Sequence, residues 1–281
     1  MRRTAALLAA LALALGASLI ATTPAYAAPA RANGQSNPVI FIHGYSSTNC
    51  STYWSKASSL FSSTGWTGAR VTYGYYTDDS SCSHEYAGSL NSSIKTIGKD
   101  LANWIYTTYS KNGVKVDVVA HSMGGLIIRS ALTEVAKKTA GWPAYLYVED
   151  VVTLGTPHDG AIVAGGLCIF VNNTQCSEMS AGSTFLQGLT ARPESAMQTD
   201  WTNIGSYADE IVTAASATYM NGQHKIQYQL AAGLQHAELI TASTGTYSSR
   251  FSHNGAAWSA YAARVNPVQW ARNAVYYSSS T

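Results

Sequence analysis

Short, continuous apolar runs alternate along the chain with stretches in which apolar residues recur every three or four positions. Continuous apolar runs that end in Gly or polar residues are typical of the buried strands of a parallel sheet. We predict six such strands, at 38–44, 69–75, 114–120, 148–154, 201–206 and 225–231. The helical period is clearest in Ile94, Ile97, Leu101 and Ile105, which fall on one face of a helix.

The remaining periodic stretches predict further helices over residues 51–61, 123–135 and 267–277. Strands that alternate with helices indicate an α/β fold, a compact and mostly parallel sheet of about six strands flanked by helices. Neither an internal repeat nor a linker divides the sequence. We therefore predict a single domain over residues 28–281.

The first 27 residues have the three-part layout of a secretory signal peptide. Arg2 and Arg3 form a cationic start, an apolar run covers residues 5–20, and Ala25-Tyr26-Ala27 is a cleavage signature of small residues. The apolar run is short for a bilayer span, which needs about 20 residues. We predict cleavage after Ala27, a secreted protein with no membrane span, and a short tail at 28–36.

Composition narrows the choice of partners. Hydrophobic residues make up 46% of the chain, which argues against disorder. Charged residues are only 11%, with 17 basic against 15 acidic, so no excess of Lys and Arg exists to neutralise phosphates. The sequence therefore disfavours nucleic acid as a partner, and we expect a monomer.

Four cysteines in an exported chain predict disulfides. Three pairings are possible. We favour Cys50–Cys82 and Cys168–Cys176, because cysteines that are neighbours in sequence close the shorter loops. A metal site is the alternative, but the sequence has no CxxC and no His at ligand spacing, so we expect no metal.

The segment Ala120-His121-Ser122-Met123-Gly124 lies between a predicted strand and a predicted helix. This is the context of a nucleophile elbow, in which a tight turn exposes a reactive serine and requires small residues two positions away on either side. We predict that Ser122 is the nucleophile and that the Met123 amide helps to bind an oxyanion. His121 is expected to point away and pack.

A second motif, His43-Gly44-Tyr45, follows the first predicted strand. This position supplies the other oxyanion donor in such folds, so we predict that role for the Tyr45 amide. His43 is expected to support the loop. Its use as the catalytic base is the less favoured alternative, because it precedes the nucleophile in the chain.

These motifs resemble the class 2 lipases, the small secreted bacterial triacylglycerol lipases of the α/β-hydrolase superfamily. The resemblance covers most of residues 37–245 and rests on residues 39–45, 116–125, 151–155 and 207–212. It implies the α/β-hydrolase fold and hydrolysis of esters. The family largely lacks a lid, so a long insertion here departs from its pattern.

The acid and the base follow from their positions after Ser122. Asp209 comes three residues after a predicted strand, where the family also has its acid, with Asp159 and Glu210 as alternatives. His236 lies in the loop after the last predicted strand, and His253 is its competitor. The order nucleophile, acid, histidine is the one expected for this architecture.

The predicted function is that of a secreted carboxylic ester hydrolase, a triacylglycerol lipase that works through an acyl-enzyme and needs no cofactor. Its substrate would be an acyl ester or lipid, in part at an oil–water interface. Residues 158–200, long and irregular, could form a lid or acyl-binding wall, or a surface excursion. Two alternatives stay open: an esterase for short acyl chains or polyesters, and a catalytically silent binding protein.

Overall fold

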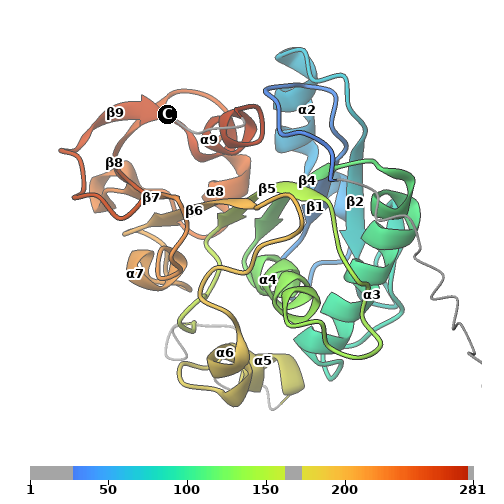
Figure 1. Ribbon diagram of the computed structural model, residues 1–281. Coiled ribbons are helices and arrows are strands. Elements are labelled where there is room, and N and C mark those ends of the chain that lie inside the picture. The colour runs from blue at the N-terminus through green and yellow to red at the C-terminus, as the bar shows by residue number, and fades with distance from the viewer. Residues whose placement is uncertain (1–27, 162–172, 278–281) are drawn as a thin grey trace, which may run out of the picture.

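The computed structural model describes residues 28–161 and 173–277, and within them the strands form one sheet (Figure 1). The strands are β1 (Val39–Ile42), β2 (Arg70–Gly74), β3 (His84–Glu85), β4 (Val116–His121), β5 (Val148–Leu154), β6 (Asp200–Ser206), β7 (His224–Tyr228), β8 (Thr246–His253) and β9 (Ala262–Val265). Their order is β3-β2-β1-β4-β5-β6-β7-β8-β9. Neighbours are parallel from β3 to β7, and β8 and β9 add an antiparallel edge.

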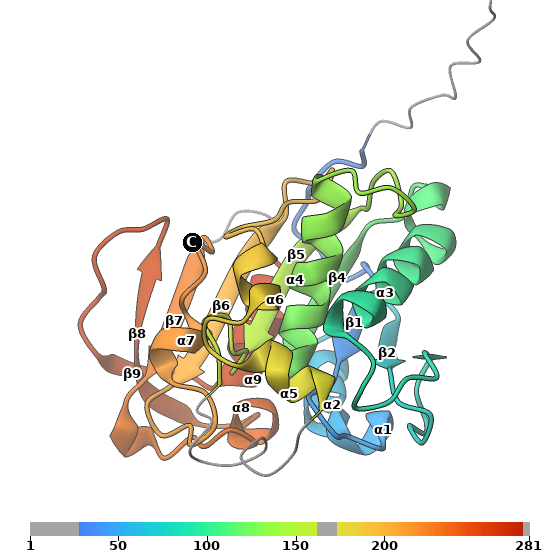
Figure 2. The same ribbon diagram turned by 90° about the horizontal axis from the view of Figure 1, so that it is seen from below.

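Helices cover both faces of the sheet. They are α1 (Cys50–Tyr53), α2 (Ser55–Ser63), α3 (Ile94–Thr108), α4 (Met123–Ala136), α5 (Thr174–Met179), α6 (Thr184–Gly188), α7 (Ala214–Ala217), α8 (Glu238–Thr241) and α9 (Pro267–Ala274). In Figure 2, α3 and α4 lie in front of the sheet, with α5 and α6 on the same side. Helices α2, α8 and α9 lie behind it.

Two apolar cores hold these layers together. On one face, Ile97 and Leu101 of α3 and Leu126 of α4 pack with the sheet, and Met179 of α5 and Leu186 of α6 belong to the same cluster. On the other face, the apolar sides of α2, α8 and α9 pack against a second cluster of strand residues. A parallel sheet buried on both faces explains why its strands are continuous apolar runs.

All six predicted strands are present, as β1, β2 and β4 to β7. The expected count of about six is too low, since the described residues hold nine strands. Strand β3 has only two residues and is a strand because it pairs in parallel with β2. Strand β8 reads Thr-Tyr-Ser-Ser-Arg-Phe-Ser-His, which contains no apolar run, and it exists because it extends an already formed edge.

Two expectations about chain segments need correction. The predicted helix over 51–61 is divided at Trp54 into α1 and α2. Residues 28–36 are not a loose tail, because the Arg31 guanidinium binds the Asp150 carboxylate at 2.8 Å and the Gly34 amide donates to the Tyr276 carbonyl at 3.0 Å. The segment is therefore fastened to the body of the molecule.

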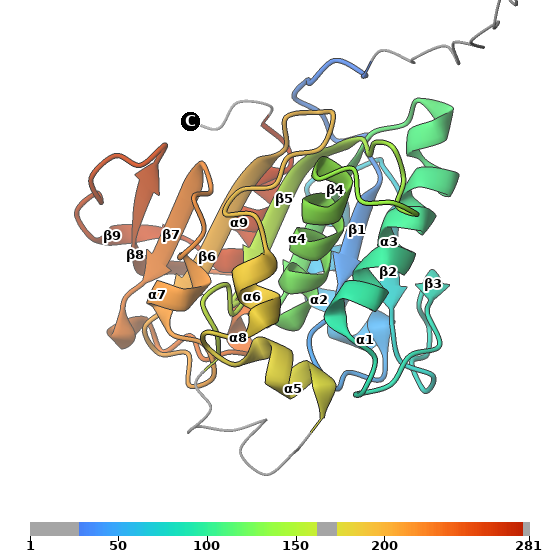
Figure 3. The same ribbon diagram turned by 60° about the horizontal axis from the view of Figure 1, so that its bottom comes forward.

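The predicted bond Cys50–Cys82 is confirmed, with a Cα–Cα distance of 5.1 Å. Cys168, the expected partner of Cys176, lies outside the described residues, and so does the predicted signal peptide. Within the predicted lid segment, the described part includes α5 and α6 (Figure 3). None of the helices in the described ranges is long and apolar enough to cross a membrane.

Candidate active site

Ser122 occupies the sharp turn between β4 and α4. Its backbone angles are φ 54° and ψ −130°, a conformation that non-glycine residues rarely adopt. The Ser122 amide donates to the Leu154 carbonyl at 2.9 Å, which holds the turn against β5. A Cβ on Gly124 would come within 2.6 Å of the Ile42 carbonyl oxygen, so the turn requires glycine there. The structure thus maintains strain at Ser122 through packing.

Asp209 and His236 form a hydrogen-bonded pair in the structure. The distance between Asp209 Oδ2 and His236 Nδ1 is 2.8 Å, and both side chains are buried. Asp209 Oδ1 accepts from the amides of Ile211 and Val212, which fixes the carboxylate. The carboxylate places the proton of a neutral imidazole on Nδ1, which leaves Nε2 as the basic nitrogen.

This pair lies at the carboxyl edge of the sheet, beside the Ser122 turn. A Cβ on Gly155, which follows β5, would lie 3.1 Å from both Asp209 Oδ2 and His236 Cε1. The rings of His121 and His236 have centroids 4.5 Å apart, and His121 precedes Ser122 directly. Three loops far apart in sequence therefore meet at one place.

His121 does more than pack, because it joins these loops through hydrogen bonds. Its Nε2 lies 3.0 Å from the His236 carbonyl oxygen, which can only accept, so Nε2 carries the proton. Burial lowers the pKa of His121 well below its usual value, so the ring is neutral and Nδ1 accepts from the Tyr53 hydroxyl at 2.6 Å. The same hydroxyl accepts from the Gly44 amide at 3.0 Å.

Gly44, Tyr53, His121 and His236 thus form one continuous chain of hydrogen bonds. It connects the loop after β1, the end of α1, the nucleophile turn and the histidine loop. Sequence reasoning did not identify Tyr53, because it lies in a predicted helix and no motif marks it. Only the fold brings its hydroxyl between the two loops.

His43 lies under the loop that carries Tyr45, with no side-chain exposure. Its Nε2 is 2.9 Å from Asp79 Oδ2 and its Nδ1 is 2.7 Å from the Gly44 carbonyl oxygen. The ring also stacks on Tyr75 at 4.1 Å. Both ring nitrogens face oxygen acceptors, so the geometry fits a support for the loop and disfavours a base.

Tyr45 and Met123, the predicted oxyanion donors, follow β1 and begin α4 respectively. The Tyr45 side chain is half-buried, and its hydroxyl accepts from Asn173 Nδ2 at 2.7 Å. Asn173 also caps α5, since its side chain accepts from the Cys176 amide. The predicted lid segment therefore touches the loop that carries Tyr45 through Asn173, a contact that sequence reasoning missed.

The alternative residues lie elsewhere or have other contacts. Glu210 accepts from the His236 backbone amide at 3.2 Å, so its hydrogen bond is to the loop, whereas the ring is bonded to Asp209. Asp159 is exposed. His253 ends β8, opposite the first residue of β7, and its Nδ1 is 3.1 Å from that of His224. His253 therefore lies at the end of the sheet where the parallel strands begin, whereas Ser122 lies at the end where they finish.

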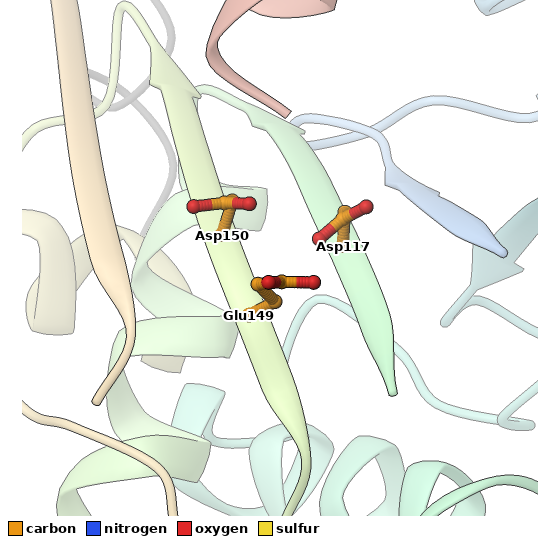
Figure 4. A group of neighbouring side chains, drawn as sticks. All are labelled: Asp117, Glu149 and Asp150. Carbon is orange, nitrogen blue, oxygen red and sulfur yellow. The ribbon is translucent and has the colours of Figure 1, made fainter. Parts of the chain in front are cut away.

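A second group of titratable side chains lies at the amino end of the strands. One carboxylate oxygen from each of Asp117, Glu149 and Asp150 lies within 4.8 Å of the other two (Figure 4). Burial raises the pKa of Asp117 well above its usual value, and the nearby charges of Asp150 and Glu149 add to this. Burial also raises the pKa of Asp150 to about 7, although Arg31 opposes the shift.

Four donor groups already point at this acidic group. The Arg31 guanidinium binds Asp150, the Lys115 ammonium binds Glu149 at 2.6 Å, Asn37 Nδ2 donates to both Asp117 and Glu149, and the Ala32 amide donates to Glu149. Two amide nitrogens and two cations compete with a metal ion for the same oxygens. The group therefore fits a proton-binding anchor for the N-terminal segment better than a metal centre.

The sheet order, the helices on both faces and the strained serine turn are those of an α/β-hydrolase fold. The sequence matches the model of the family described as "Lipase (class 2)" over residues 36–245. The chain therefore belongs to the class 2 lipase family, as its motifs predicted. No curated protein sequence matches it.

Solved structures with the same fold share little sequence with this chain. Lipase BlEst2 of Bacillus licheniformis in its mature form is 20% identical, with a TM-score of 0.46, and the match covers 68% of this chain and 83% of that one. The propeptide form of the same lipase is also 20% identical, with a TM-score of 0.44, and the match covers 67% of this chain and 45% of that one. Lipase B of Aspergillus fumigatus is 16% identical, with a TM-score of 0.50 and coverage of 76% and 52%. The chain thus spans less than half of the propeptide form of BlEst2.

Proposed function

We propose that this protein is a secreted carboxylic ester hydrolase, a triacylglycerol lipase with Ser122, His236 and Asp209 as its catalytic triad. The observation that carries the proposal is the buried 2.8 Å contact between Asp209 and His236 beside the strained turn of Ser122. This arrangement belongs to serine hydrolases that form acyl-enzymes.

In the proposed mechanism, His236 Nε2 takes the proton from the Ser122 hydroxyl as its oxygen attacks the ester carbonyl. Asp209 holds the imidazole in the required tautomer and stabilises the imidazolium. The amides of Tyr45 and Met123 donate to the oxyanion, and each such donor typically lowers the barrier by about 2.7–4 kcal/mol. The alcohol leaves with the proton from His236, and water then cleaves the acyl-enzyme by the same route.

The chain of hydrogen bonds through Tyr53 and His121 supports this mechanism, because it couples the position of the oxyanion loop to that of the base. Tyr53 and His121 are positioning residues in this proposal and do not touch the substrate. The strain at Ser122 is consistent with a turn that presents its side chain above the sheet.

The first test replaces Ser122 by Ala and measures hydrolysis of a soluble p-nitrophenyl butyrate. We expect loss of turnover with unchanged thermal unfolding, because the substitution removes only the nucleophile. Turnover at the wild-type rate would refute the assignment.

A second measurement compares initial rates on the soluble ester and on an emulsified long-chain triacylglycerol. Higher activity on the emulsion supports a lipase. Activity confined to the soluble ester retains the triad but makes the protein an esterase for short acyl chains. No activity of the wild-type chain on either favours the silent binding protein.

A further inference from the structure

A cavity of about 480 Å³ is lined by residues of strands β7, β8 and β9 and of helix α9. Much of its lining is apolar, with Ile226 on β7, Phe251 on β8, and Val265 and Ala274 on β9 and α9. Its size is within the range of about 300–1,000 Å³ that is usual for small-molecule sites.

Two hydrogen-bond donors that belong to residues of this lining have no partner among the described residues. Arg264 Nε and Trp270 Nε1 are both buried as atoms and both make no hydrogen bond. The other end of the Arg264 guanidinium donates to Ser259 Oγ at 3.1 Å and to the Ala260 carbonyl at 3.3 Å. A buried donor without an acceptor is costly, so an acceptor supplied by a ligand would be stabilising here.

The charge of the cavity favours an anion. Arg264 has no carboxylate within ion-pair distance in the described part of the chain, and its guanidinium lies over the Phe251 ring at 5.0 Å. Asp200 Oδ2 lies 3.5 Å from His224 Nε2, and the His224 ring is itself 4.5 Å from that of His253. Asp200 is therefore next to the histidine pair, and no acidic side chain among the described residues forms an ion pair with Arg264.

We propose that this cavity binds a small apolar carboxylate, such as the anion of a medium-chain fatty acid. The carboxylate would accept from Arg264 Nε and Trp270 Nε1, and the acyl chain would lie on Ile226, Val265 and Ala274. A carboxylate only accepts hydrogen bonds, which matches the two N–H donors Arg264 Nε and Trp270 Nε1. A third buried nitrogen of the lining without a hydrogen bond, His224 Nε2, lies 3.5 Å from Asp200 Oδ2. Its apolar chain matches the lining, whereas a phosphate ion would leave that surface exposed.

The site is separate from the candidate triad. It is built around His224 at the start of β7 and His253 at the end of β8, whereas Ser122 and Asp209 follow the carboxyl ends of β4 and β6. The inference goes beyond ester hydrolysis and does not require it. A carboxylic acid is nevertheless what the proposed reaction would release.

The test titrates the full chain with sodium decanoate, below its micelle concentration, by isothermal calorimetry. We expect saturable binding to the wild-type protein and binding weakened about tenfold or more by Arg264→Gln, since a charge-assisted hydrogen bond is lost. Trp270→Phe should weaken binding less, because it removes one neutral donor. The matched control Arg272→Gln removes the same charge from α9, where the guanidinium bonds to Thr64, and should leave binding unchanged.

Equal affinity of the wild type and Arg264→Gln, or no binding to the wild type, would overturn the proposal. If Arg264→Gln does not fold, the proposal is tested with Trp270→Phe and with a crystal structure of the decanoate complex. A carboxylate bound anywhere else in that crystal structure overturns the proposal. Decan-1-ol should bind more weakly than decanoate. Binding is measured without turnover, and Arg264→Gln should hydrolyse p-nitrophenyl butyrate at the wild-type rate, so failure here and failure of the proposed hydrolase function are distinguishable.

Discussion

Ser122, the proposed nucleophile, has an unfavourable backbone conformation that its surroundings maintain. Its positive φ is unfavourable for a side chain with a Cβ, typically by about 1–3 kcal/mol. The surroundings over-determine this conformation, since the Ser122 amide is bonded to Leu154 and a Cβ on neighbouring Gly44 would come within 2.9 Å of Ser122 Cβ. A strained serine enclosed by close packing is what a pre-organised nucleophile requires.

Asp209 and Glu210 offer a matched pair of substitutions at adjacent positions. We expect Asp209→Asn to lower kcat by roughly 10³–10⁴-fold, because an amide no longer selects the tautomer of His236. Glu210→Gln should change kcat by less than about tenfold, since the amide oxygen can still accept from the His236 backbone. Steady-state kinetics on p-nitrophenyl butyrate checks both. The reverse ranking would assign the acid to Glu210.

Tyr53→Phe tests the positioning role of the hydrogen-bond chain. The substitution removes the hydroxyl that accepts from Gly44 and donates to His121. We expect kcat to fall roughly tenfold with little change in KM, because about 1.4 kcal/mol of lost positioning corresponds to that factor. Tyr106→Phe on α3 is a control for loss of a tyrosine hydroxyl. A fall in thermal stability with unchanged kcat would show a purely structural role.

At the scale of elements, α1 is too short to be stable alone, since isolated helices under about 12 residues are marginal in water. It has four residues, and it depends on the Asn49 cap, on the Cys50–Cys82 bond and on packing. Its last residue is Tyr53, which belongs to the hydrogen-bond chain. The disulfide therefore has consequences for the candidate site as well as for stability.

The double substitution Cys50→Ser and Cys82→Ser should lower the free energy of unfolding by up to about 3–4 kcal/mol, as expected for a sequence separation of 32 residues. Urea unfolding measures this change. The pair Cys168→Ser and Cys176→Ser is the comparison, and its shorter predicted loop gives about 2.5 kcal/mol. We also expect only the first pair to lower kcat together with stability. An equal effect of both pairs on kcat would contradict the link through α1.

For the whole molecule, the buried acids at the amino end of the sheet make stability depend on pH. Unfolded aspartate loses its proton near pH 3.9, whereas folded Asp150 does so at about 7. Between these pH values the folded state binds more protons than the unfolded state. Asp150 therefore contributes its full stabilisation of the folded state below about pH 3.9, and this contribution is lost as the pH rises through 7. The raised pKa of Asp117 acts in the same direction.

Asp117→Asn replaces a buried carboxyl group that titrates with a neutral amide, whose oxygen can still accept from Asn37. We expect the difference in Tm between variant and wild type to grow from pH 5 to pH 8, with the variant more stable at pH 8. Glu194→Gln, at an exposed ion pair with Arg192, is the control and should give a nearly constant difference. Parallel curves for Asp117→Asn and wild type would mean that the acids are balanced by Arg31 and Lys115.

The central strands, the main helices, the Ser122 turn and the family could be predicted from the sequence, because these features are local. A buried parallel strand must be continuously apolar, and a nucleophile turn requires small residues at fixed spacing. It also favoured Asp209 and His236 through their order along the chain. The pairing Cys50–Cys82 followed from loop length alone.

Features that depend on residues distant in sequence could be recognised only in the folded structure. The strands β8 and β9 form because an edge is present to receive them, and residues 28–36 are fixed because buried acids of β5 bind Arg31 and the Ala32 amide. The contact of Tyr53 with His121, and the cavity beside Arg264, arise from packing and carry no periodic signal. Local patterns specify elements, whereas sites that join loops are determined by how those elements pack.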